Sequence, residues 1–76
     1  TFISLPEPIL AFTRHTEEET ITCVFNLSPD THVIRVVGAP IVTLANAATL
    51  NEGRLALDGN GFVYLSHEAE ITFTKD

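Results

Sequence analysis

The residues of this sequence best suited to chemistry are three adjacent acids, Glu17, Glu18 and Glu19. Paired carboxylates could act as a general acid and base, or they could bind calcium. A general acid needs a raised pKa, which usually comes from burial. A calcium loop needs oxygen ligands at alternating positions and a glycine for its turn. Because this run joins two apolar segments, we expect an exposed hairpin loop with solvated carboxylates.

A second run, Asp58-Gly59-Asn60-Gly61, has part of the pattern of a calcium-binding loop. It lacks the later glutamate at the required spacing. Its two glycines, the aspartate and the asparagine all tolerate positive φ, as a tight hairpin turn requires. We therefore predict a hairpin turn at residues 58–61.

The three histidines could ligate a metal only if the fold brought them together. His15, His32 and His67 lie far apart in the sequence, and none has the short spacing that is typical of metal ligands. We expect surface histidines, each on a loop or a strand edge.

Cys23 is the only cysteine. A reactive thiolate would need a nearby cation or a helix N-terminus. Cys23 instead alternates with Ile21 and Phe25, which predicts a buried core residue. A lone apolar-flanked cysteine is also typical of a reducing compartment. The sequence thus predicts no catalytic, cofactor-binding or metal-binding residue and no cofactor.

The elements that would position these side chains are short extended segments divided by turn signals. Ser28-Pro29-Asp30 and Asn51-Glu52-Gly53 are predicted turns, and the prolines of residues 5–8 favour an extended lead-in. The predicted strands are residues 9–14, 20–27, 31–37, 54–57, 62–66 and 70–74, with 41–44 as a short strand and 45–50 as irregular structure or a short strand. Such spacing predicts one all-β domain over residues 1–76, a small antiparallel β-sandwich, Greek-key-like, of about six to eight strands.

Within the strand at 20–27, alternation predicts which side chains are buried. Ile21, Cys23, Phe25 and Leu27 share one face at a period of two, and we expect that face in the core. If Phe25 is a core residue, Phe25→Ala should cost about 3–5 kcal/mol.

Aromatic residues are the remaining candidates for a binding surface. We expect core packing for most of them, because Phe has no polar handle for sugars and the chain has one Tyr and no Trp. Several strands are nevertheless apolar on both faces, whereas a free sheet normally wets one face. We therefore expect a neighbouring domain, or dimerisation of the isolated chain, to cover an outer face. The aromatic residues are Phe2, Phe12, Phe25, Phe62, Tyr64 and Phe73.

Composition excludes two kinds of partner. Ten acids against four bases give a net charge of −6, which disfavours nucleic acid. No apolar stretch approaches the roughly 18 residues that a membrane span needs. The sequence begins at Thr1 and has no Met, so we expect a fragment of a longer polypeptide. Asn26-Leu27-Ser28 matches a glycosylation acceptor, and we interpret the match as chance.

Residues 9–28, ILAFTRHTEEETITCVFNLS, carry a resemblance to a known family. A hydrophobic strand ending in Arg, an acidic loop and a strand ending in Asn-hydrophobic-Ser resemble the C-terminal β-domain of glycoside hydrolase family 13, which includes α-glucosidases, oligo-1,6-glucosidases and α-amylases. Residues 31–37 and 61–74 are similar in pattern only, and Ser66-His67-Glu68-Ala69 departs from the family's turn before the last strand.

The resemblance implies a non-catalytic domain that packs on and stabilises an upstream (β/α)8 barrel. That barrel would hold the Asp nucleophile, the Glu acid/base and a third Asp of a retaining mechanism. It further implies a bacterial, cytoplasmic parent enzyme that hydrolyses α-glucosidic bonds in small oligosaccharides, with weak or no carbohydrate binding by this domain. Two alternatives stay open, a carbohydrate-binding module and an unrelated β-sandwich interaction domain.

Overall fold

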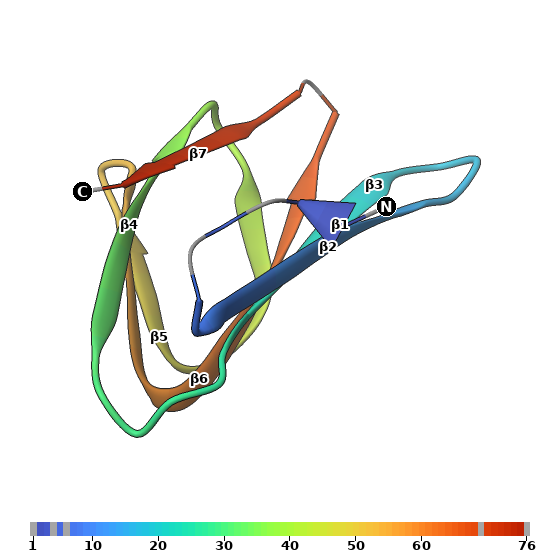
Figure 1. Cartoon of the computed structure of the whole chain (residues 1–76). Helices are drawn as coiled ribbons and strands as arrows, with labels where there is room; N and C mark the ends of the chain where they lie inside the picture. The colour runs from blue at the N-terminus through green and yellow to red at the C-terminus, as the bar shows by residue number, and fades with distance from the viewer. Residues whose placement is uncertain (1, 4, 6, 69, 76) are drawn as a thin grey trace.

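A computed structural model describes residues 2, 3, 5, 7–68 and 70–75, with the backbone alone for Phe2 and Lys75. The described residues form an antiparallel all-β sandwich without helix, which confirms the predicted fold class (Figure 1). Its strands are β1 (Phe2–Ile3), β2 (Ile9–His15), β3 (Thr20–Asn26), β4 (His32–Val37), β5 (Ile41–Asn51), β6 (Arg54–His67) and β7 (Thr72–Lys75).

The strands form one sheet that folds over on itself. Its order is β1-β2-β3-β6-β4-β7, and β5 pairs with β6 outside that path. The second half of β6 pairs with β3 and its first half with β4, so β6 runs through both layers. The β5–β6 hairpin turns at Glu52 and Gly53, whose φ values of 51° and 81° suit a tight two-residue turn. The turn predicted at residues 51–53 is therefore confirmed.

The hairpin turn predicted at residues 58–61 is wrong. These residues lie inside β6, at the point where the strand passes from one layer to the other. A Cβ on Gly59 would collide with the Pro29 carbonyl, and one on Gly61 with the Ala47 carbonyl. The glycines thus mark a close approach of backbones at a bend, which has the same sequence signal as a turn.

β5 is longer than predicted, because residues 45–50 continue the strand that begins at Ile41. Register shifts between Val42 and Leu44 and between Asn46 and Ala48 are β-bulges, and Ala47 has a φ of 53°. The bulges let β5 follow the bend of β6. They also interrupt the alternation on which the prediction depended.

The core lies between the two layers. The face of β3 that lines the core is the opposite of the predicted one. Val24 is fully buried in the core, and Thr22 and Asn26 share its face. Cys23 and Phe25 lie on the opposite, outer face, so the prediction that they line the core is wrong. The buried core residues are Ile9, Ala11, Val24, Ile34, Val36, Leu55, Leu57, Val63, Leu65 and Ile71.

Asn26 organises the loop that joins the layers. Its side chain is 1% exposed, and its Nδ2 donates to the carbonyls of Asp30 (2.7 Å), Leu57 (3.1 Å) and Asp58 (3.1 Å). Its Oδ1 accepts from the Ser28 backbone N–H (3.1 Å) and hydroxyl (2.9 Å). These bonds confirm the turn predicted at residues 28–30. They also leave the Asn26 amide inaccessible to glycosylation in the folded chain.

The prediction of an extended segment over residues 5–8 is wrong for residues 7 and 8. Glu7 and Pro8 form a turn across a cis peptide bond. The Pro8 carbonyl accepts a hydrogen bond from the Leu27 N–H at 3.0 Å. Pro6 lies outside the described residues.

Candidate functional site

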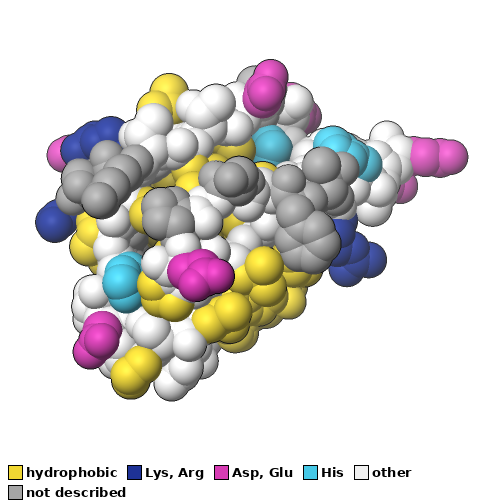
Figure 2. Space-filling model, in the orientation of Figure 1, with side chains coloured by type: hydrophobic (Ala, Val, Ile, Leu, Met, Phe, Trp, Pro, Cys, Tyr) yellow, Lys and Arg dark blue, Asp and Glu magenta, His cyan; other side chains and the backbone are white. Residues whose placement is uncertain are grey.

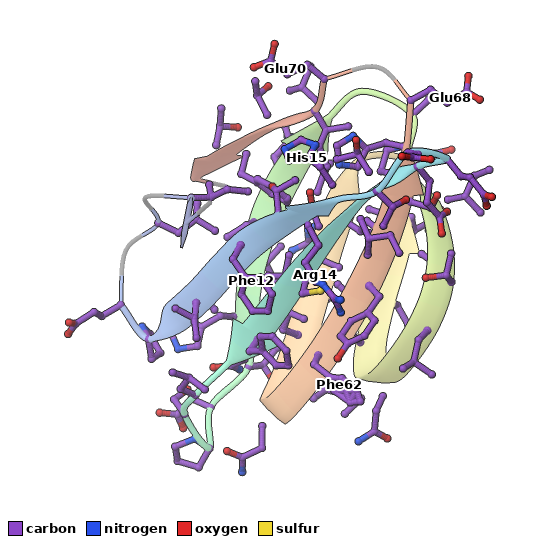
Figure 3. All side chains as sticks on the ribbon, turned by 90° about the vertical axis from the view of Figure 1, so that its right-hand side faces the viewer. Phe12, Arg14, His15, Phe62, Glu68 and Glu70 are labelled. Atoms are coloured by element: carbon purple, nitrogen blue, oxygen red, sulfur yellow. The ribbon has the colours of Figure 1, made fainter. Side chains whose placement is uncertain are left out.

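The outer side of the β2–β3–β6 layer carries a continuous apolar surface, here called the aromatic face. Register places its side chains in two adjacent rows. One row runs through Leu10, Phe25 and Phe62, and the other through Phe12, Cys23, Tyr64 and Leu44. Figure 2 shows hydrophobic side chains gathered at the lower right of the molecule, and Figure 3, viewed from that side, shows Phe12 and Phe62 on the outer surface.

Four rings form the centre of the aromatic face. Phe25 contacts three of them, with ring centroids 5.9 Å from Phe12, 6.0 Å from Phe62 and 6.2 Å from Tyr64. The Phe12 and Phe25 rings are stacked at 20°, whereas Tyr64 meets Phe25 edge-on at 76°. All four rings are half-buried, and Leu44 beside them is 50% exposed. The face therefore leaves ring surface open to a partner.

The core packing predicted for most aromatic residues is wrong for these four rings. Phe73, by contrast, packs against the core. Phe2 pairs through its backbone with Phe12, and its side chain lies outside the described part. The expectation that some strands are apolar on both faces is confirmed, since β3 buries Val24 inside and Cys23 outside.

Cys23 is buried as predicted, with 2% exposure, although it lies on the aromatic face between Phe12 and Tyr64. Burial raises the pKa of the Cys23 thiol, and the nearby Arg14 guanidinium opposes part of that rise. A protonated, inaccessible thiol is a poor nucleophile. Cys23 thus packs beneath the rings as a small apolar side chain.

The fold brings two of the three histidines, which are distant in the sequence, into one row. His15, Thr20 and His67 form one cross-strand row on the inner side of the layer. His15 Nδ1 lies 3.2 Å from Thr20 Oγ1, and His67 Nε2 lies 2.8 Å from the hydroxyl of Thr22. Only the register of β2, β3 and β6 could have revealed this juxtaposition. His32 lies elsewhere, on β4.

The histidine row lines a cleft of about 400 Å³ at one end of the sandwich. Three Thr hydroxyls lie around it, and Thr22 connects to Thr13 at 3.2 Å. Glu68 and Glu70 flank the cleft and point away from one another into solvent (Figure 3). Among the described residues, no three His, Cys, Asp or Glu side chains are grouped so as to hold a metal ion.

The acidic run is a solvated hairpin loop, as predicted. Glu17, Glu18 and Glu19 are exposed, and the Glu19 N–H donates to Thr16 Oγ1 at 3.0 Å. The Glu19 carboxylate accepts a hydrogen bond from the Ser66 hydroxyl at 2.9 Å. These contacts shape the loop, and they bring no second carboxylate into an acid–base pair.

No family model, no curated protein and no solved structure matches this chain. In the described part of the chain, no helix has the length and the apolar character that a membrane span requires. The resemblance to the glycoside hydrolase domain is therefore supported by the sequence only, and mainly by residues 9–28.

Proposed function

We propose that this chain is a non-catalytic accessory domain that uses its aromatic face to pack on a larger domain of the same polypeptide. The observation that carries the proposal is a second apolar surface outside the core. Phe12, Phe25, Phe62 and Tyr64 lie in contact with one another there, and none of them belongs to the core cluster.

Physical chemistry favours a covered aromatic face. An antiparallel sheet that is free in water normally has one polar face. Contiguous exposed apolar surface usually marks an interface, and aromatic side chains supply much of the binding energy of interfaces. Phe25 lies at the centre of this surface, with the other rings around it. A neighbour covering the face would remove these rings from water.

The resemblance supplies the proposed identity of that neighbour. The hairpin that resembles the glycoside hydrolase domain is β2–β3, which also contributes Leu10, Phe12 and Phe25 to the aromatic face. The neighbour would be the (β/α)8 barrel of a retaining α-glucosidase that acts on small oligosaccharides. The catalytic carboxylates of that mechanism would belong to the barrel, about 5 Å apart.

Carbohydrate binding by the aromatic face is the second candidate, and the side-by-side half-exposed rings of Phe62 and Tyr64 favour it. Sugar rings stack on aromatic faces, and the Tyr64 hydroxyl could add a hydrogen bond. Titration of the chain with maltotriose and isomaltotriose separates the two proposals. We expect no heat from either sugar, whereas millimolar or tighter binding would favour the sugar-binding function.

Limited proteolysis of the full polypeptide that the gene encodes tests the accessory role. Phe62→Ser places a polar side chain in the aromatic face and should speed release of the domain by protease. Val37→Ser is the matched control, because Val37 is an apolar side chain, 53% exposed, on β4 in the other layer. Equal release of both variants, or a gene that encodes no larger domain, would refute the proposal.

A further inference from the structure

Arg14 is the single charged residue in the part of the sheet that carries the four rings, which consists of β2, β3 and residues 62–67 of β6. This part contains no other Asp, Glu, Lys or Arg. Register places Arg14 opposite Ile21, and Ile21 opposite Ser66, in the outer row next to that of Phe12. In Figure 3 the Arg14 side chain extends from β2 on the side of the sheet that carries Phe12 and Phe62. A neighbour that covers the rings would therefore also meet this guanidinium.

No described residue forms an ion pair with Arg14. The nearest acids along the chain are in the hairpin loop, where the Glu19 carboxylate accepts its hydrogen bond from Ser66. Arg14 lies two residues after Phe12 on β2, so its side chain is on the same face of the sheet as the rings (Figure 3). The chain as a whole is acidic, with a net charge of −6. Arg14 is thus a local positive charge on an apolar surface.

A neighbour that covers the aromatic face would remove the Arg14 guanidinium from water, which is unfavourable for a charged group. Removing a charge from water without a partner costs several kcal/mol, so a neighbour that buries Arg14 must compensate it. A carboxylate is the best match, because the planar guanidinium fork forms two parallel hydrogen bonds with it. Arginine is also among the residues that contribute most to interface energy.

We propose that the surface covering the aromatic face is apolar and presents an Asp or Glu carboxylate to Arg14. This inference depends on the proposed accessory role and adds the chemistry of the partner surface to it. Arg14 then determines the orientation of the neighbour on the sheet, since a single charge pair in an apolar contact disfavours other registers.

Three variants of Arg14 in the full polypeptide test this proposal by thermal unfolding. Arg14→Met removes the charge and keeps an apolar stem, and it should lower the unfolding midpoint by about 2–4 °C or more. Arg14→Glu places two negative charges together and should lower the midpoint further. Arg14→Lys keeps the charge without the fork and should restore part of the loss. Glu18→Met is the control for removal of an exposed charge, because Glu18 lies in the hairpin loop and outside the aromatic face.

Phe62→Ser, measured in the same series, separates failure of this inference from failure of the accessory role. If Phe62→Ser lowers the midpoint while Arg14→Met and Arg14→Glu leave it equal to that of Glu18→Met, the carboxylate is absent and the accessory role stands. If neither Phe62→Ser nor any Arg14 variant differs from Glu18→Met, both proposals are overturned.

Discussion

Phe25 lies directly opposite Phe62 across the β3–β6 pairing, with ring centroids 6.0 Å apart on the outer side of the sheet. This cross-strand pair defines the orientation of the whole layer. Its partners inside the sandwich are the next pair along the strands, Val24 and Val63, both fully buried. The layer is therefore apolar on both sides, and its more aromatic side faces outward.

Phe25→Ala should destabilise the isolated chain less than a core substitution does. Phe25 is half-buried on the outer face, so we expect a loss of about 1–2 kcal/mol, below the 3–5 kcal/mol of a core phenylalanine. Leu55→Ala, at a fully buried core position, should cost about 2–5 kcal/mol. Urea denaturation of both variants measures the difference. A larger loss for Phe25→Ala than for Leu55→Ala would contradict the assigned faces.

Asn26→Leu should destabilise the chain by at least about 2–3 kcal/mol, because buried backbone carbonyls and the Ser28 N–H lose their partner. Asn26→Asp keeps the shape and the acceptor but cannot donate, so it should also be strongly destabilising. Ser28→Ala removes one hydroxyl donor to the same amide and should cost about 1 kcal/mol. Denaturant midpoints that rank Ser28→Ala as the worst of the three would show that Asn26 does not organise this loop.

Gly61→Ala tests the bend in β6. The new methyl group would meet the Ala47 carbonyl of the paired strand, and we expect a loss of about 1–3 kcal/mol. Asn60→Gly is the control, because glycine adopts the positive φ of 59° at this neighbouring position without strain. Chemical denaturation should show a clear loss for Gly61→Ala and a small change for Asn60→Gly. An unchanged Gly61→Ala variant would mean that the two strands do not approach so closely.

The Cys23 thiol should make stability fall at alkaline pH. Its pKa is raised in the folded chain, so above the ordinary thiol value of about 8.5 the unfolded chain loses this proton more readily than the folded one. Stability that is present at neutral pH should therefore decrease as the pH rises above the ordinary thiol value. Cys23→Ala is the control, and it should remove this part of the pH dependence. Identical alkaline profiles for the two proteins would contradict a raised thiol pKa.

Local signals in the sequence predicted most of the strands. β2, β3 and β4 match their predicted ranges within about one residue, because Glu17–Glu19 and Ser28-Pro29-Asp30 are turns by local chemistry. The length of β6 could not be predicted, since a glycine pair has the same signal in a hairpin turn and at a bend between layers. Gly59 and Gly61 are required by contacts with Pro29 and Ala47, which are distant in sequence.

The sequence predicted that an outer apolar surface exists, but it did not predict which side chains form that surface. The apolar character of both faces of β3 could be recognised in the sequence, and it predicted an outer surface in need of cover. Alternation cannot decide which face is inside when Cys23 and Phe25 compete with Val24 and Thr22. That choice depends on Leu55, Leu57 and the other residues that β4 and β6 bring across the sandwich. The row of His15 and His67 likewise depends on long-range register.

Hydroxyl-radical footprinting of the full polypeptide tests most directly whether the aromatic face is covered. The oxidation rates of Phe12, Phe25 and Phe62 are compared with those in the isolated chain, and exposed Val37 on β4 serves as the internal reference in the other layer. We predict that the three rings become protected in the full polypeptide while Val37 reacts equally in both. Rings that react as fast in the full polypeptide as in the isolated chain would contradict the accessory role.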